Sequence, residues 1–306
     1  MIQLTELKTL LLKQSAQPNR PMHLSAASGL VQVGSWLYVV ADDELHLAQF
    51  SLQGDDAGDL HRCFEGDLPL DIEERKAAKP DMEVLTLIPQ PNNPSQQALL
   101  ALSSGSKKSR YRSAIIPLDH GGNIYAPAEI IDLSPFYEFL QKEVGKLNIE
   151  GAAIVQNDMF LFQRGNKKNK LNATIRLKLE DFYRVLLKPN KSHEPHIKIT
   201  PYDLGEIDEV PLCFTDATSL PSGEIIFTAS AENTSDSYLD GACMGSSIGM
   251  INSKGDLSLL EPIDKKVKLE GVEAIENEKT IQIMVVTDAD DATHPAQLYS
   301  ASINRQ

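Results

Sequence analysis

The sequence predicts an all-β fold, specifically a five-bladed β-propeller with four-stranded blades. Two observations carry this prediction. Short apolar runs bounded by turn residues follow one another along most of the chain, which is typical of a sandwich, a barrel or a propeller. An internal repeat of about one blade in length then favours the propeller. The five repeats begin at Ala27, Met82, Ile149, Thr215 and Leu269.

Each repeat has the same order of features, seen most clearly in "IEGAAIVQNDMFLFQRGN" and "LEGVEAIENEKTIQIMVVTDADD". A small or acidic residue precedes a short strand, a turn and a strongly apolar strand that ends in polar residues. Further apolar runs supply the third and fourth strands, such as "HLAQFSL" and "GDLHRCF" in the first repeat. Helices are scarce, and the best candidate covers residues 134–147 and is opened by Ser134 and Pro135.

The two ends of the chain complete this count. The last repeat stops after its third strand, "QLYSASI", while the N-terminal "QLTELKTLLL" precedes the first repeat and has no other place. We therefore predict that residues 3–12 pair with the strand around 297–303 and close the ring, which leaves only short exposed edges. Residues 1–306 would form a single propeller domain. Because the repeat is degenerate, six blades remain an alternative.

Composition limits the partners. The formal net charge is −14 and the isoelectric point about 4.9, which argues against nucleic acid and anionic membranes. The cysteines Cys63, Cys213 and Cys243 show no metal-binding spacing, so we expect reduced thiols. The sequence shows no signal peptide and no run of about 18 apolar residues, so we expect a cytoplasmic protein. It gives no indication of the oligomeric state.

The first residues of the repeats predict a metal site. The first strand of a propeller blade lines the central channel, so equivalent residues of the five repeats should form a ring at one mouth. In the fourth repeat the neighbours Thr215 and Thr218 remain alternatives to the acid. Glycine follows the ring residue in three repeats, where it would allow backbones to approach closely at the axis. The predicted ring consists of Ser28, Glu83, Glu150, Asp216 and Glu270.

Converging carboxylates repel one another, so either some are protonated or a cation holds them. A hard cation that takes 6–8 oxygen ligands, typically Ca²⁺, suits carboxylates, a hydroxyl and water. The absence of histidine from the ring positions disfavours zinc or iron. The alternative is that these residues only cap backbone groups and bind channel water.

The loops after the second strands should surround the same mouth, and they differ in charge. The second and third repeats contribute basic loops with Lys107, Lys108 and Lys167. The first and last repeats contribute acids, among them Asp42 and Asp288. A basic sector in an acidic chain suggests an anionic ligand such as a phosphate group. The alternative is that these are solvated loop tips. The long segment 230–249, with Asp236 and Asp240, is a further candidate functional loop.

These features resemble the calcium-activated nucleotidases, the five-bladed soluble apyrases of animals. Their blades open with Ser, Glu, Glu, Ser and Glu around a central Ca²⁺, and "SGLVQVGSWLYVVADD" is similar to their first blade. The resemblance implies Ca²⁺ as cofactor and catalytic positions at Asp42, Asp43 and Arg164. Where that family continues with Arg-Thr-Gly this chain has Glu44-Leu45-His46, which favours binding or a different substrate. The chain also resembles bacterial phytase-like propellers of unassigned function.

The sequence thus supports two hypotheses. The first is a Ca²⁺-dependent hydrolase of phosphate esters or related anionic small molecules. The second is a non-catalytic propeller that binds a ligand or a protein and carries a structural metal in its channel. The fold alone does not choose between them.

Overall fold

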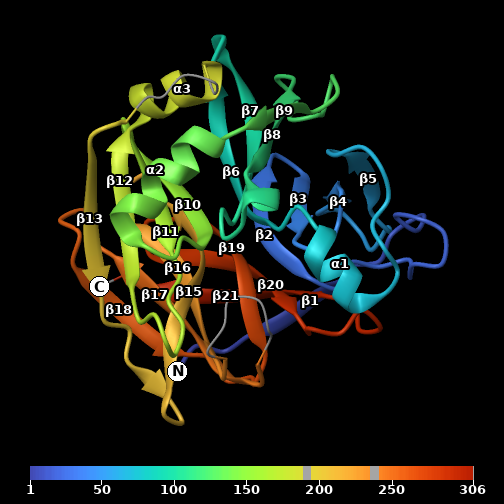
Figure 1. The fold of residues 1–306 in the computed structure, drawn as a ribbon. Coiled ribbons are helices and arrows are strands. Elements are labelled where there is room, and N and C mark those ends of the chain that lie inside the picture. The colour runs from blue at the N-terminus through green and yellow to red at the C-terminus, as the bar shows by residue number, and fades with distance from the viewer. Residues whose placement is uncertain (189–193, 235–240, 306) are drawn as a thin grey trace.

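The computed structural model describes residues 1–188, 194–234 and 241–305. Five antiparallel sheets surround a central axis as the blades of a propeller (Figure 1). The first strands of successive blades contact one another around this axis, and the first strand of the last blade returns to that of the first. The predicted fold class is therefore confirmed.

The first three blades have four strands each, connected as successive antiparallel neighbours. Blade 1 comprises β2 (Ala27–Val33), β3 (Trp36–Ala41), β4 (His46–Ser51) and β5 (Asp59–Arg62). Blade 2 comprises β6 (Met82–Gln90), β7 (Asn93–Ser103), β8 (Arg112–Leu118) and β9 (Glu129–Asp132). Blade 3 comprises β10 (Ile149–Val155), β11 (Asp158–Gln163), β12 (Asn172–Lys178) and β13 (Ile197–Tyr202).

Blade 4 departs from the predicted four strands because a short extra strand pairs with the outward extension of its first long strand. It comprises β14 (Glu206–Ile207), β15 (Val210–Ser219), β16 (Ile225–Glu232), β17 (Cys243–Ile251) and β18 (Leu257–Pro262). The C-terminal part of the chain contributes three described strands to blade 5, namely β19 (Lys268–Glu276), β20 (Thr280–Asp288) and β21 (Gln297–Asn304).

The N-terminal segment completes blade 5, as the sequence predicts. β1 (Thr5–Thr9) pairs antiparallel with β21, with Thr5 opposite Ser300 and Thr9 opposite Gln297. The apolar residues just before and just after β1 in the chain have buried side chains, so the segment that closes the ring is part of the hydrophobic core. These side chains are Ile2, Leu4, Leu10 and Leu12.

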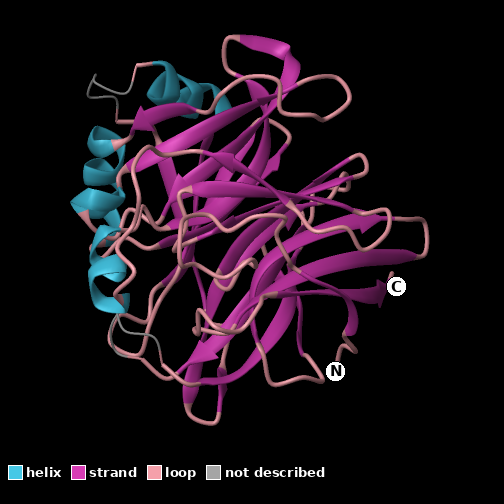
Figure 2. Cartoon of the chain, turned by 90° about the vertical axis from the view of Figure 1, so that its right-hand side faces the viewer, coloured by secondary structure: helices cyan, strands magenta, loops and turns pink. Residues whose placement is uncertain are grey.

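Three α-helices lie on one side of the strands, and the two termini lie towards the other (Figure 2). The predicted helix is present as α2 (Ser134–Val144). Sequence analysis missed α1 (Ile72–Ala78) and α3 (Leu179–Leu187). α1 is short, and α3 continues directly from β12, so its pattern merges with the preceding strand. No helix within the described ranges is long and apolar enough to cross a membrane.

Glycine follows the ring position because the blades touch there, as predicted. A Cβ atom on Gly151 would lie 2.8 Å from the backbone nitrogen of Ala217 in blade 4. On Gly29 it would lie 2.7 Å from the backbone nitrogen of Leu85 in blade 2. Real Cβ atoms do not approach backbone atoms so closely. Because protein interiors are packed as densely as organic crystals, the two backbones could not move apart without strain.

Gly151→Ala is therefore expected to destabilise the protein by about 2 kcal/mol or more, within the range for overpacked interiors. Chemical denaturation at equilibrium measures the change. Gly121→Ala is the matched control, because a Cβ atom there would meet only the ends of the Asn123 and Asp119 side chains and no backbone atom. Equal stability of the two variants would show that the blades are less tightly packed at the axis than described.

Candidate metal centre at the channel mouth

One residue at the start of each channel-lining strand stands out from the regular strand pairing. The pairing shifts between Ala27 and Gly29 in blade 1 and at the equivalent point of every other blade. Such β-bulges turn a side chain out of the regular alternation and are common beside functional sites. The residues at these bulges are Ser28, Glu83, Glu150, Thr215 and, together with Gly271, Glu270.

The structure therefore places Thr215, one of the alternatives left open above, at the fourth ring position. The neighbouring Asp216 is fully buried, and its Oδ2 accepts a hydrogen bond of 2.9 Å from the backbone nitrogen of Val272 in blade 5. Burial raises the pKa of Asp216 well above its ordinary value. Asp216 thus lies between two blades, whereas the other four predicted ring residues line the cavity at the mouth.

This cavity is small and highly charged. About 70 Å³ is open to the centres of water molecules. One water needs roughly 10–15 Å³ by this measure, so the cavity has room for several waters or a hydrated ion but not for a nucleoside or a sugar. Among the described residues, seven acidic and five basic side chains line it. The acids are Asp42, Asp81, Glu83, Glu150, Glu232, Glu270 and Asp288, and the bases are Lys76, Lys79, Arg110, Arg164 and Lys268.

Arg164 follows β11 and holds the acids of blades 3, 4 and 5. Its Nη1 lies 3.0 Å from Oε2 of Glu150 and 3.8 Å from Oε1 of Glu270. Its Nη2 lies 2.6 Å from Oε2 of Glu232. Carboxylates surround this guanidinium, so it serves the ring as an internal cation rather than as an open anion site.

Lys268, the first residue of β19, plays the same part in blade 5. Its Nζ lies 2.8 Å from Asp290, 3.1 Å from Asp288 and 3.2 Å from Glu270. The side chain is only 9% exposed. The two buried cations Arg164 and Lys268 therefore neutralise much of the charge that we expected a metal ion to hold.

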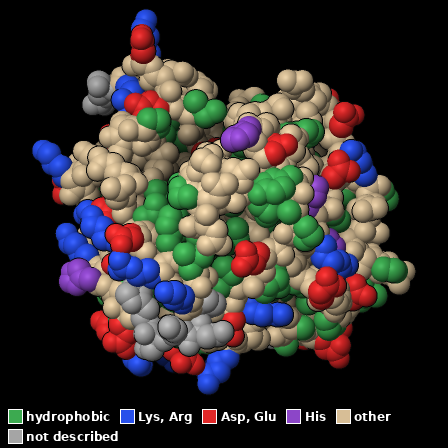
Figure 3. Space-filling view, turned by 90° about the horizontal axis from the view of Figure 1, so that it is seen from above, with side chains coloured by type: hydrophobic (Ala, Val, Ile, Leu, Met, Phe, Trp, Pro, Cys, Tyr) green, Lys and Arg blue, Asp and Glu red, His purple; other side chains and the backbone are tan. Residues whose placement is uncertain are grey.

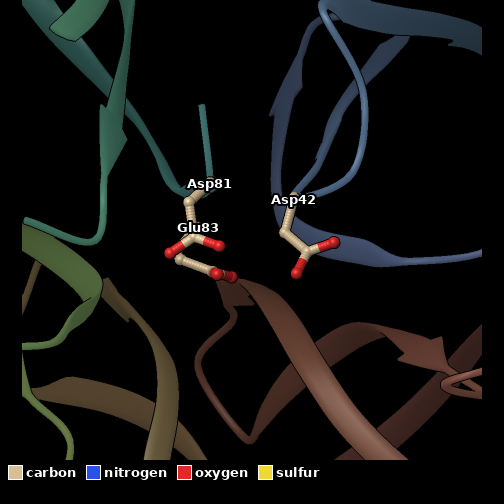
Figure 4. A group of neighbouring side chains, drawn as sticks. All are labelled: Asp42, Asp81 and Glu83. Carbon is tan, nitrogen blue, oxygen red and sulfur yellow. The ribbon is translucent and has the colours of Figure 1, made fainter. Parts of the chain in front are cut away.

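Blades 1 and 2 contribute the group of acids that best fits a metal ion. Asp42, Asp81 and Glu83 each present a carboxylate oxygen, and these three oxygens lie within 4.8 Å of one another. Figure 4 shows Asp42 reaching from the end of β3 towards Asp81 and Glu83 at the start of β6. Lys79 lies at the same place, in contact with Asp42 and 3.1 Å from Oδ1 of Asp81. Arg110 donates to Oδ2 of Asp81 over 2.7 Å.

Burial and mutual repulsion shift the pKa values of these acids. Burial, together with the carboxylate of Glu150, raises the pKa of Glu83 well above its ordinary value. Burial raises the pKa of Asp42 to about 7, although Lys79 opposes the shift. For Asp81 burial is outweighed by Lys79 and Arg110, so its pKa is lowered. The repulsion among these acids is thus reduced partly by protonation and partly by the neighbouring lysine and arginine side chains.

The donor set suits a hard divalent cation. Within the described residues it offers carboxylate and hydroxyl oxygens, which are the ligands that Ca²⁺ prefers. Two buried atoms nearby have no partner, Oε2 of Glu270 and the hydroxyl of Thr215, whereas Oε1 of Glu270 lies 3.2 Å from Nζ of Lys268. Buried polar atoms without partners are rare and indicate that a further ligand or water would satisfy them. We conclude that the residues present fit such a cation.

The other predicted site residues divide into two groups. Asp42, Arg164 and Asp288 line the cavity, as the loop assignment predicts. Asp43 does not line the cavity; its Oδ2 is paired with Arg20 at 2.6 Å and lies 3.6 Å from Arg75.

The basic loop residues also stay outside. Lys107 and Lys108 are exposed at the short helix η1 (Lys108–Arg110), and Lys167 donates to Asn233 at the surface. None of the three lines the cavity. Asp236 and Asp240 lie outside the described residues. On the face seen from above in Figure 3, acidic and basic side chains lie mainly towards the edges, and hydrophobic side chains gather nearer the centre.

Sequence analysis missed several residues that line the cavity, and four of them share one position. Asp81, Asn148, Cys213 and Lys268 each stand two residues before the ring residue of their blade. Because this position recurs at the same distance from the ring residue in four repeats, it was accessible to the repeat alignment. Lys79 carries no such signal, because it comes from the end of α1, whereas Arg110 belongs to the basic loop of the second repeat that was expected at the mouth.

Fold and site together define a class: five-bladed propellers with an acidic channel mouth that internal lysine and arginine side chains partly neutralise. Within this class the chain belongs to a family of unknown function, DUF6929, whose model matches residues 23–303. No curated protein matches the chain in sequence.

Several solved structures are similar to the chain. The catalytic domain of a GH62 α-L-arabinofuranosidase from Coprinopsis cinerea aligns with a TM-score of 0.52 and 10% identity, over 98% of this chain and 96% of that one. A structure of a nidogen–laminin complex aligns with a TM-score of 0.41 and 10% identity, over 95% and 90% of the two chains. A polysaccharide lyase of family PL25, an ulvan lyase, aligns with a TM-score of 0.41 and 9% identity, over 98% of this chain and 74% of that one. None of these three is a nucleotidase or a phytase-like protein.

Proposed function

We propose that the channel mouth binds one divalent cation, and that Ca²⁺ is the cation. The observation that carries this proposal is the approach of three buried or partly buried carboxylates, from Asp42, Asp81 and Glu83, to within 4.8 Å of one another. Carboxylates brought so close repel unless a positive charge lies among them. Oxygen donors without histidine or cysteine favour Ca²⁺ or Mg²⁺ over transition metals.

We further propose that the bound cation serves hydrolysis of a small phosphate ester or related anion, as the resemblance to the soluble apyrases implies. A bound divalent cation supplies charge for a phosphoryl oxygen and lowers the pKa of a coordinated water. Asp42, at the cavity wall, is placed to accept a proton from an attacking water. Arg164 would act as a positioning residue, because three carboxylates already surround its guanidinium. The cavity volume admits only the reacting group, so the rest of the substrate would lie above the mouth.

One observation favours the second candidate function, a binding propeller with a structural cation. The basic loop residues proposed to hold an anion, Lys107, Lys108 and Lys167, do not line the cavity. A screen of phosphate and carboxylate esters, with Ca²⁺ and with chelator, separates the two functions. Calcium-dependent turnover that Asp42→Asn abolishes supports the hydrolase. Calcium binding without any turnover supports the binding propeller.

Removal of single carboxylates tests the cation site directly. Asp42→Asn and Glu83→Gln are each expected to weaken Ca²⁺ binding at least about tenfold, because each removes one negative charge from the ligand set. Isothermal titration calorimetry on chelator-treated protein measures the affinity, and the calcium-induced rise in melting temperature provides a second readout. Glu150→Gln should have a smaller effect, because Arg164 and Asn148 already contact that carboxylate.

Glu273→Gln is the matched control. Glu273 is also a carboxylate on a channel-lining strand, but it lies beyond the ring, where Thr218 and the backbone nitrogen of Gln32 donate to it. Its substitution should leave Ca²⁺ binding unchanged. Absence of binding and of any thermal shift at millimolar Ca²⁺ in the wild type would refute the cation proposal.

A further inference from the structure

The ammonium group of Lys79 lies at the position that the proposed cation would take. Its Nζ contacts a carboxylate oxygen of Asp42 and lies 3.1 Å from Oδ1 of Asp81. Both acids belong to the group whose oxygens lie within 4.8 Å of one another. A cation bound among these oxygens at the usual Ca²⁺–oxygen distance of about 2.3–2.6 Å would lie beside the ammonium. Two positive charges at that separation repel strongly in a buried site.

A charge count leads to the same conclusion. Asp42, Asp81 and Glu83 together carry three negative charges when ionised. Arg110 pairs with Asp81 and offsets one of them, and Lys79 offsets a second. With Lys79 in place the group keeps a single negative charge, which does not balance a divalent cation. Without Lys79 the group carries two negative charges, which does.

We propose that Lys79 is a tethered internal cation that competes with the metal ion, so that a divalent cation binds only when the Lys79 side chain leaves the cavity. This inference rests on the proposed cation site and adds what controls its affinity. Lys79 thereby sets the calcium concentration at which the site fills.

The position of Lys79 on the fold allows this exchange. Lys79 is the residue at the C-terminal cap of α1, and its backbone nitrogen donates to the carbonyl of Arg75 over 2.8 Å. The buried Arg75 side chain fixes the helix to blade 1, because it donates to the carbonyl of Asp43 and to Oε1 of Glu44. The flexible Lys79 side chain can therefore leave while the helix stays in place.

The test is the calcium affinity of Lys79→Gln, measured by titration calorimetry on the whole chain. The variant is expected to bind Ca²⁺ at least about tenfold more tightly than the wild type, because the competing charge is gone. Lys108→Gln is the control. It removes the same charge from an exposed residue that does not line the cavity, so it separates the position of Lys79 from a general change in charge. We expect its affinity to stay within about threefold of the wild type, as for a solvent-screened charge.

A second readout follows the lysine itself. Acetylation of Lys79 by acetic anhydride, quantified by peptide mass spectrometry, should rise severalfold when Ca²⁺ saturates the wild-type protein. Lys268 should stay protected in both states, because its carboxylate partners Asp288 and Asp290 lie outside the proposed ligand group.

The outcomes separate this inference from the cation proposal on which it rests. Tighter binding by Lys79→Gln supports the inference, including the case in which only the variant binds Ca²⁺. Equal affinities, with Lys79 acetylation unchanged by Ca²⁺, overturn the inference and leave the cation site standing. Failure of both proteins to bind Ca²⁺ refutes the cation site, and the inference with it.

Discussion

Deletion of residues 1–12 is expected to bring the protein to the limit of stability or to prevent it from folding. The segment buries the side chains of Ile2, Leu4, Leu10 and Leu12 and supplies the outer strand of blade 5. Full burial of one such side chain contributes roughly 1.5–3 kcal/mol, so together they contribute on the order of 6–12 kcal/mol. Whole domains of this kind are stable by only about 5–15 kcal/mol. Thermal unfolding and chemical denaturation measure the loss.

Single leucine substitutions in the same segment provide the control. Leu10 is fully buried, whereas its neighbour Leu11 is 49% exposed. Leu10→Ala should cost about 2–5 kcal/mol, and Leu11→Ala about 0.5 kcal/mol or less. A deletion variant that melts like the full-length chain would show that blade 5 is stable without β1 and would overturn the role of closure.

The closure could be predicted because the repeat provides a count. Five alignable strand pairs left one strand missing at the C-terminus and one unplaced at the N-terminus, and both belong to the same blade. The extra strand β14 could not be predicted in this way. It has only two residues, Glu206 and Ile207, and depends on a hairpin with β15 rather than on any repeated pattern.

The position of the ring could be predicted to within one residue. The alignment by residue type chose Asp216 in blade 4, because an acid stands at this position in three other repeats. The strand pairing chooses Thr215, because the bulge falls between Phe214 and Asp216. A bulge depends on how two backbones pair, and a single sequence does not record that pairing.

Sequence analysis expected protonation or a bound cation to offset the negative charge of the ring. The structure shows that lysine and arginine side chains of the chain itself offset part of that charge. Lys268 lies in the repeat pattern two residues before Glu270 and could have been found. Lys79 reaches the cavity from the end of α1, where no periodic signal exists, whereas Arg110 stands in the basic loop of the second repeat that was expected there. Charge balance in a buried site therefore requires the three-dimensional neighbours of each acid as well as the repeat.

Replacement of Lys268 by methionine is expected to be the most destabilising single substitution at the mouth. The side chain is 9% exposed, and its ammonium lies within 3.2 Å of carboxylate oxygens of Glu270, Asp288 and Asp290. Removal of one partner of a buried ion pair leaves uncompensated charge and typically costs about 3–5 kcal/mol. For a chain of this size that corresponds to a fall in melting temperature of roughly 5–8 °C. Lys13→Met is the control, because its ion pair with Asp59 is exposed and should be worth about 1 kcal/mol or less.

The pH dependence of this loss identifies its cause. Lys268 helps to lower the pKa of Asp288. A carboxyl group with a lowered pKa stabilises the fold fully when the pH is above its ordinary pKa, near 3.8. This stabilisation is lost as the pH falls through the lowered pKa. Without Lys268 the orphaned acids must take up protons to remain buried, so the cost should be larger at pH 8 than at pH 5. Methionine matches the length of the lysine stem, so a loss caused by packing alone would not vary with pH. If Lys268→Met keeps wild-type stability at pH 8 in the presence of Ca²⁺ but loses it with chelator, a bound metal ion has replaced the ammonium. The cation site would then extend from Asp42 and Glu83 to the acids of blade 5.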